Sequence, residues 1–217
     1  MDNKISRNFN KINTTGIKKE TEMKDLSNET IDPFVDKCIS SIQNCKDLKE
    51  IWRFLDDTTK ENSKLKKISN TEYKYNDYYI NLGKKFALGP HIYGLMDNKS
   101  LSLSCMPEFI HCYECNDKKD CVLVTRIPDT EDEMPLPYSK NSSIVTLEAK
   151  RKFVNEITSM VEKGFTNIGI DNMENWYIVP KTGRIIISDW SQFAGFSNDK
   201  AKSAYKKRIN DMCGLIY

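Results

Sequence analysis

The stretch that decides the fold is Gly169–Trp190, which reads GIDNMENWYIVPKTGRIIISDW. Two runs rich in β-branched and aromatic residues, WYIV and RIII, flank the turn-forming sequence PKTG (180–183). They predict two antiparallel strands joined by a tight turn. Asp171 precedes the first strand and Asp189 follows the second. Because a hairpin folds its two ends together, both carboxylates are expected at one edge of the predicted sheet.

Two carboxylates held in this way suit phosphoryl transfer. That chemistry needs one carboxylate near the attacking hydroxyl, a second that holds magnesium against the phosphates, and a lysine that neutralises phosphate charge. The more common role of two such aspartates is structural, because Asp171 would cap a turn and Asp189 would end a strand. The spacing alone leaves both interpretations open.

The same stretch resembles the catalytic loop of protein kinases with its following hairpin and metal-binding aspartate, and it aligns with that pattern without a gap. The resemblance implies that Asp171 orients the substrate hydroxyl and that Asp189 binds Mg²⁺ beside the phosphates of ATP. Trp176 falls at the family's metal-binding asparagine, and a one-residue shift in the loop would make Asn175 the second metal ligand. ATP and magnesium are therefore the expected cofactors.

Upstream, the run LKEIWRFLDDTTKENSKLKKI (48–68) is similar to the kinase segment that leads to the third strand, which nominates Lys66 as the phosphate-contacting lysine. Residues 70–88 predict an amphipathic helix, since tyrosines and a leucine recur at helical spacing. On the kinase pattern, Asp77 then stands where the helix offers its glutamate to that lysine. The basic run that contains Lys66 also fits an ordinary solvated surface.

The run CVLVTRIPDT (121–130) resembles the kinase strand that enters the hinge between the two lobes. The resemblance therefore implies Thr125 and Ile127 as nucleotide contacts.

The sequence departs from the kinase pattern at positions that cover the phosphates or support the catalytic loop. No glycine occurs between Ile39 and Glu50, where a phosphate-covering loop needs close approach of its backbone. Gly169 replaces the expected histidine and Met173 the expected lysine of the catalytic loop. The sequence therefore supports two functions, a divergent protein Ser/Thr kinase and a catalytically impaired pseudokinase that acts as a protein-binding module.

The remaining patterns complete an α+β chain. Residues 34–68 alternate as strands do, with a helix over Asp36–Phe54 as a nearly equal alternative. Further short strands are predicted at 92–96, 101–106, 109–115 and 121–127, and helices at 146–164 and 198–216. We expect a minimal two-lobed protein-kinase-like fold with a truncated C-lobe. It would comprise a flexible leader (1–30), an N-lobe (31–128) and a reduced C-lobe (129–217).

The C-lobe is short, because only 217 − 189 = 28 residues follow Asp189. This truncation is similar to that of the minimal kinases that bacteria secrete into host cells, of the OspG and NleH kind. Two short phrases strengthen the resemblance, EIW at 50–52 and RIPDT at 126–130. It implies a protein substrate, including host signalling or ubiquitin-pathway proteins, and a cytoplasmic location that extends to the host cytosol for a secreted effector.

Composition narrows these functions further. A net charge of +2 does not suggest a nucleic-acid-binding protein. No apolar run approaches the length of a membrane span, and the N-terminus lacks the apolar block of a secretory signal. Seven scattered cysteines predict reduced thiols. Cys112 and Cys115 have half of a zinc-site spacing, which leaves a small zinc-stabilised domain as a further alternative to buried cysteines of a β-hairpin.

Overall fold

The computed structural model describes residues 31–98, 101, 103–115, 119–163, 166–167, 170, 172–190, 193–194 and 198–215. The predicted leader lies outside these residues. Contacts divide the chain into two compact units, Met1–Asp32 and Pro33–Tyr217. All of the helices and strands that the structure describes belong to the second unit.

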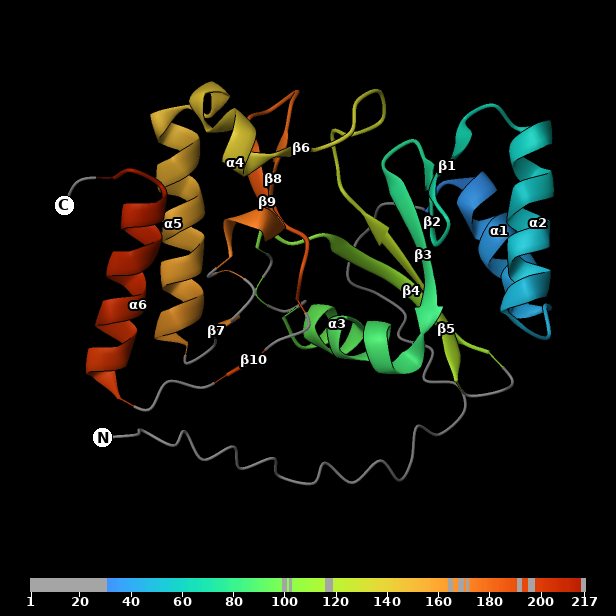
Figure 1. Ribbon diagram of the computed structural model, residues 1–217, viewed down its shortest axis with the longest axis horizontal. Helices are drawn as coiled ribbons and strands as arrows, with labels where there is room; N and C mark the ends of the chain where they lie inside the picture. The colour runs from blue at the N-terminus through green and yellow to red at the C-terminus, as the bar shows by residue number, and fades with distance from the viewer. Residues whose placement is uncertain are drawn as a thin grey trace. The chain divides into compact units, whose positions relative to one another are not determined.

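A five-stranded antiparallel sheet forms the N-terminal half of this unit (Figure 1). In spatial order its strands are β1 (Leu65–Ser69), β2 (Glu72–Tyr75), β3 (Tyr78–Lys84), β5 (Asp120–Arg126) and β4 (Glu108–Glu114). Strands at 109–115 and 121–127 were predicted, and β4 and β5 confirm them. The connector after β5 returns the chain to the C-terminal half.

The predicted helix over residues 70–88 is wrong, because most of that segment forms the β2–β3 hairpin. Asn76 adopts a left-handed conformation with φ of 52°, which asparagine tolerates and which tight hairpin turns require. The turn restarts the strand alternation, so Tyr73 and Tyr75 before it and Tyr78 and Ile80 after it all enter one core. Tyr75, Tyr78 and Leu82 of this core are three and four residues apart, which imitates a helical stripe.

Two helices precede the sheet and cover one of its faces, α1 (Pro33–Gln43) and α2 (Leu48–Glu61). The strands predicted for the start of residues 34–68 are therefore wrong. The helical alternative over Asp36–Phe54 has the right type of structure, but the segment forms two helices that are separated at residues 44–47. Asp47 caps α2 by accepting a hydrogen bond from the Glu50 backbone N–H, and the Glu50 carboxylate accepts one from the Lys46 backbone N–H. This reciprocal capping fixes the start of the helix.

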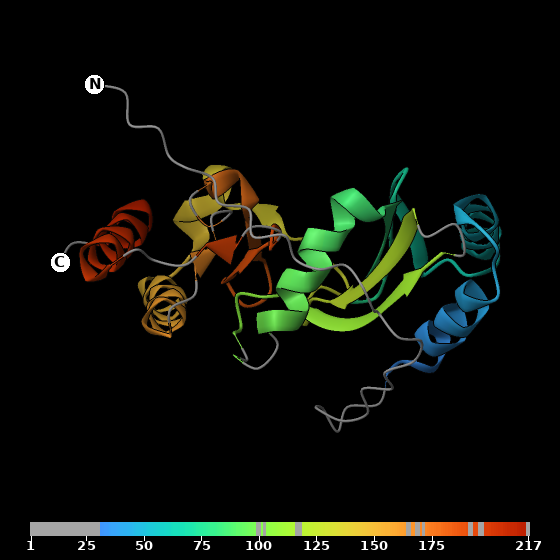
Figure 2. The same cartoon turned by 90° about the horizontal axis from the view of Figure 1, so that it is seen from below.

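Helix α3 (Lys85–Asn98) follows β3 directly and contacts β3, β4 and β5 on the opposite face of the sheet (Figure 2). The strand predicted at 92–96 lies inside this helix, and residues 101–106, where described, form turns rather than a strand. Pro90 lies within α3, so the proline does not end this helix.

The C-terminal half contains the predicted hairpin, β8 (Trp176–Val179) and β9 (Arg184–Ile187), with β6 (Leu136–Pro137) beside β8. Helices α5 (Leu147–Glu162) and α6 (Asp199–Met212) confirm the two predicted C-terminal helices. The short elements are α4 (Tyr138–Asn141), 3-10 helices at Ser142–Ile144 and Met173–Asn175, and the pair β7 (Thr166–Asn167) and β10 (Phe193–Ala194). Within the described residues no helix is both long and apolar enough to cross a membrane.

One core joins the two halves. It contains Leu95 of α3, Leu123 of β5, Ile157 of α5 and both Trp176 and Trp190. The chain is thus a small α+β protein, consistent with a truncated two-lobed kinase-like fold. The second face of the sheet and the C-terminal hairpin share this core, so residues at the end of β9 lie next to α3.

Candidate functional site

The candidate site lies at the C-terminal end of β9, where the hairpin delivers Asp189. Gly183 makes the turn possible, since it adopts φ of +66° and its N–H donates to the Val179 carbonyl at 2.8 Å. The four strand residues that follow are largely buried and fix the direction of β9. Asp189, two residues beyond the strand, is half-buried.

Asn175 and Asp189 are brought to the same place by a backbone clamp. The Ser188 N–H donates to the Asn175 carbonyl at 2.9 Å, and the Ser188 hydroxyl donates to the same oxygen at 3.2 Å. Asn175 ends the short 3-10 helix before β8 and is half-buried, as Asp189 is. Asp171 lies outside the described residues. The structure therefore holds the backbone of Asn175 next to Ser188, the residue before Asp189.

Trp176, the residue that the ungapped alignment put at the metal-binding asparagine, belongs to the core. It is fully buried, and its indole N–H donates to the Ile170 carbonyl at 2.9 Å. Its ring makes edge contacts with Tyr138 and Phe153 at centroid distances of 5.3 and 4.9 Å. Trp176 therefore offers no metal ligand, and the assignment of Asn175 by a one-residue shift stays a prediction.

His91 is a component of the site that sequence reasoning missed. The backbone N–H of Trp190 donates to His91 Nδ1 at 3.0 Å, so this nitrogen acts as an acceptor. Burial lowers the pKa of His91, and the nearby Asp189 carboxylate acts in the opposite direction. Trp190 is also anchored by its indole N–H, which donates to the Ile187 carbonyl at 2.8 Å. A neutral His91 on α3 thus fixes the residue that follows Asp189.

Lys66 lies on β1, the first strand in chain order, whereas the kinase pattern requires its lysine on the third. Its side chain is exposed, at the edge of the sheet. On β3, Tyr78, Ile80 and Leu82 enter the core against α1 and α2, so Tyr79, Asn81 and Gly83 occupy the opposite face. The third strand therefore presents no lysine toward the C-terminal half.

The buried lysine on this face is Lys74, the cross-strand partner of Lys66. Lys74 is 5% exposed, and its ammonium donates to the carbonyl oxygens of Thr130 at 2.5 Å and Glu131 at 3.1 Å. Burial lowers its pKa, with a further contribution from the positive charge of Lys66. The Tyr79 hydroxyl donates to Thr130 Oγ1 at 3.3 Å. Side chains of β2 and β3 therefore donate hydrogen bonds to Thr130 and Glu131, in the connector that follows β5.

Asp77 lies in the β2–β3 turn and not on a helix. It is buried, and Arg126 Nε donates to its carboxylate at 2.7 Å. Among the described residues its ion pair is with Arg126 and not with Lys66. The helical position assigned to Asp77 is thus wrong, because the hairpin turn places it at the end of β5.

The expected nucleotide contacts lie next to this ion pair. Thr125 is buried on β5. The Ile127 N–H already donates to the Asp77 carbonyl at 2.8 Å, and Pro128 has no N–H to offer. Arg184 donates to the Pro128 carbonyl at 2.7 Å and to the Ser104 carbonyl at 3.0 Å. The backbone groups of Ile127 and Pro128 that could meet a nucleotide are therefore already hydrogen-bonded within the protein.

The cysteine pair does not form a zinc site. Cys115 is fully buried in the core against α1 and α2, whereas Cys112 packs against the core on the other face of the sheet. In the part of the chain that the structure describes, no group of three or more histidine, cysteine, aspartate or glutamate residues could hold a metal ion. Burial and neighbouring thiols and carboxylates raise the pKa of Cys121 to about 11, as expected for an inert thiol.

The fold and the site define a small α+β protein in which the polar residues Asn175, Ser188 and Asp189 lie near the end of β9. No protein-family model matches the chain, and no curated protein matches it. Among solved structures 46 chains match, one of which is a medium-resolution structure of the bifunctional kinase-methyltransferase WbdD. The TM-score is 0.43 and the sequence identity 8%, over 65% of this chain. The chain spans 34% of that protein's length, and a likeness at this TM-score establishes neither fold nor activity.

Proposed function

We propose that the chain is a divergent minimal protein kinase, which transfers the γ-phosphoryl group of ATP to a protein hydroxyl with the help of Mg²⁺. The observation that supports the proposal is the Ser188–Asn175 clamp, which joins the backbone of Asn175 to the residue before Asp189 at the end of the hairpin. Carboxylate and amide oxygens are hard ligands of the kind that magnesium prefers. Asp171 would orient the attacking hydroxyl.

This chemistry depends on position and charge more than on covalent participation of the protein. The hydrogen bonds of Trp190 with His91 and with the Ile187 carbonyl anchor the backbone on both sides of Asp189, which suits a residue that must keep a metal against phosphates. On this proposal, Asn175 and Asp189 would hold the metal together with phosphate oxygens. When bound, magnesium would neutralise charge on the transferred group.

A second candidate is a pseudokinase that binds a protein partner without transferring phosphate. It is favoured by the N-terminal half, where Lys66 is exposed on the wrong strand and Asp77 pairs with Arg126. The Ile127 N–H also favours the pseudokinase, because it already donates to the Asp77 carbonyl. For both candidates the resemblance to secreted minimal kinases makes host signalling and ubiquitin-pathway proteins the partner class to test first.

The binding of Mg-ATP distinguishes the kinase from the pseudokinase. A ligand at 100 times its Kd stabilises the native state by about 2.7 kcal/mol, which for a chain of this size raises Tm by roughly 5–10 °C. We expect Mg-ATP to produce such a shift in the wild type and Asp189→Ala to abolish it. Asp57→Ala, an exposed aspartate of α2, is the matched control and should retain the shift. A wild type without any shift would reject the kinase and leave the pseudokinase.

A further inference from the structure

The outer face of helix α3 is apolar and exposed. Phe86 is 83% exposed, Tyr93 50% and Met96 38%, and Pro90 between them is exposed as well. These residues follow one another at spacings of four, three and three positions, which places them on one side of the helix. We call them the α3 stripe. Figure 2 shows α3 in front of the sheet, with no other described helix or strand over it.

The opposite side of α3 is held by the protein, so the direction of the stripe is fixed. Ile92 and Leu95 are buried in the core that joins the two halves. His91 Nδ1 accepts a hydrogen bond from the Trp190 backbone N–H at 3.0 Å. These contacts anchor the inner side of the helix. The stripe is therefore a preformed, outward-facing surface.

The stripe carries no charge that would select a charged partner. Residues 86–96 read FALGPHIYGLM and contain no aspartate, glutamate, lysine or arginine. The two lysines that precede the stripe are compensated, since Lys84 Nζ lies 2.6 Å from Asp120 and Lys85 Nζ lies 2.8 Å from Glu114. A patch of large, exposed apolar side chains is typical of a contact with another apolar protein surface.

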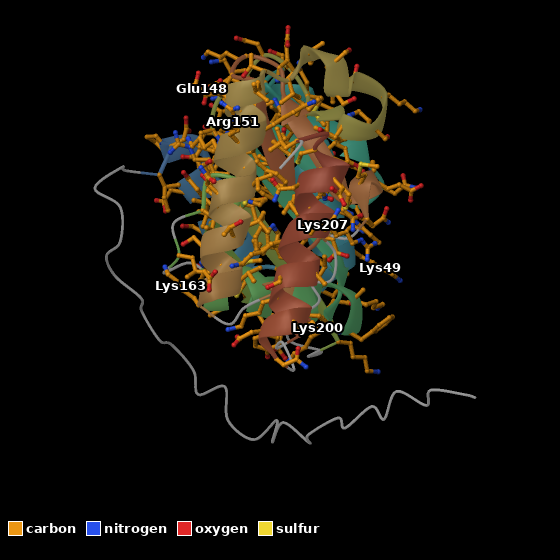
Figure 3. All side chains as sticks on the ribbon, turned by 90° about the vertical axis from the view of Figure 1, so that its left-hand side faces the viewer. Lys49, Glu148, Arg151, Lys163, Lys200 and Lys207 are labelled. Atoms are coloured by element: carbon orange, nitrogen blue, oxygen red, sulfur yellow. The ribbon has the colours of Figure 1, made fainter. Side chains whose placement is uncertain are left out.

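The C-terminal helices present a different kind of surface. Figure 3 views α5 and α6 from outside, where the charged side chains of Arg151, Lys163, Lys200 and Lys207 are exposed. Such charges are usual on a helix face that stays in water. The α3 stripe lacks them, which indicates that it is covered by another apolar surface.

The spacing of the stripe is nearly the same when it is read from either end. Turning α3 end for end about the middle of the stripe exchanges Phe86 with Met96 and Pro90 with Tyr93. Two copies of the helix can therefore pack antiparallel, with each stripe residue of one copy opposite an apolar residue of the other. A two-fold interface requires this property, because both copies contribute the same surface.

We propose that the α3 stripe binds a second copy of this chain and forms an antiparallel, two-fold symmetric dimer. Phe86 of each copy packs against the partner's Met96, and Pro90 packs against the partner's Tyr93. The interface uses the outer side of α3 only. The proposal is therefore independent of whether the chain binds nucleotide.

The exposed area predicts a weak dimer. A buried aromatic side chain contributes about 150–250 Å², so the exposed fractions of Phe86 and Tyr93 offer roughly 200–330 Å² per copy. With Pro90 and Met96 included, the two copies together would bury less than about 1,200 Å², which is typical of transient interfaces. The dimer should therefore dissociate on dilution and depend on its few large side chains.

Sedimentation equilibrium of the full chain from about 1 μM to 1 mM tests the proposal. We expect the wild type to pass from monomer to dimer and to form nothing larger, because a two-fold interface closes on itself. Phe86→Asp and Met96→Lys should each weaken dimerisation at least about tenfold, since each places a charge against an apolar side chain. Ile144→Asp is the matched control, because Ile144 is 51% exposed and lies outside the stripe. It should dimerise as the wild type does.

A mixture of Phe86→Asp and Met96→Lys tests the antiparallel arrangement. In a mixed dimer the new carboxylate meets the new ammonium on one side of the axis, and the native Phe86 meets the native Met96 on the other. We expect the mixture to recover a dimer that neither variant forms alone.

A wild type that stays monomeric at every concentration would overturn the proposal. So would association beyond the dimer, a mixture that recovers nothing, or loss of the dimer in Ile144→Asp. All of the variants replace exposed side chains. An unchanged Tm in each, measured where the wild type is monomeric, confirms that its fold is retained.

Discussion

The ion pair between Asp77 and Arg126 offers a direct test of how the β2–β3 turn is attached to the end of β5. The Asp77 side chain is 6% exposed and receives the Arg126 Nε–H at 2.7 Å. Arg126→Met would keep most of the volume and remove the charge, which leaves a buried carboxylate without its cation. Breaking a buried pair in this way costs about 3–5 kcal/mol. That is a large part of the roughly 5–15 kcal/mol typical of a folded domain.

A second contact of Arg126 contributes much less. Its Nη1 lies 3.6 Å from the Glu108 carboxylate, whose side chain is 49% exposed, and such pairs contribute about 0–1 kcal/mol. Glu108→Gln is therefore the matched control. Unfolding in urea, monitored by circular dichroism, gives the free energy of unfolding of each variant.

The double variant Asp77→Asn with Arg126→Met completes the test. We expect it to be more stable than Arg126→Met alone, because it removes the charge that the single variant leaves buried. A cost below about 1 kcal/mol for Arg126→Met, or strictly additive effects in the double variant, would refute the reasoning.

Three further predictions concern other parts of the chain. Gly183→Ala should cost about 1–2 kcal/mol, since φ is +66° and no atom lies within 4 Å of an added Cβ, whereas Gly183→Asn should cost less; urea unfolding checks both. Burial lowers the pKa values of His91 and His111, so the unfolded state binds more protons below about pH 6.5. Stability should therefore fall as the pH is lowered through that value, by up to about 1.4 kcal/mol per pH unit and histidine, and His111→Gln should reduce the fall. Trp176→Phe should cost roughly 1–3 kcal/mol, because it leaves the buried Ile170 carbonyl without its donor. A Tm measurement that shows a smaller loss of stability would contradict this prediction.

The C-terminal half was predictable because its signals are local. The hairpin needs only two apolar runs and a turn with glycine at the left-handed position, and all of these lie within residues 176–187. Asn175 and Asp189 follow from the same hairpin, since its ends must meet. Helix α5 carries its own start signal, because the Thr146 side chain accepts from the Ala149 N–H.

The N-terminal half was mispredicted because the conformation of one turn residue, Asn76, decides whether the segment forms a helix or a hairpin. Tyr75, Tyr78, Tyr79 and Leu82 fit a helix until Asn76 is allowed a positive φ, after which they belong to the two strands of a hairpin. That error moved Asp77 onto a helix, whereas the kinase resemblance of residues 48–68 had assigned Lys66 to the third strand. The contact between His91 and Trp190 spans 99 positions, so no local pattern could have shown it.

The two halves together indicate how a nucleotide would have to bind. Contacts along the connector after β5 require displacement of the Lys74 ammonium from the Thr130 and Glu131 carbonyls. A hydrogen bond to a charged group contributes about 1.5–3 kcal/mol, so losing both costs roughly 3–6 kcal/mol. Phosphates and a metal held at Asn175 and Asp189 would leave these two Lys74 hydrogen bonds in place. Affinity should therefore come from phosphates and metal, and magnesium tripolyphosphate should raise Tm about as much as Mg-ATP. A shift specific to ATP would show that the base displaces Lys74.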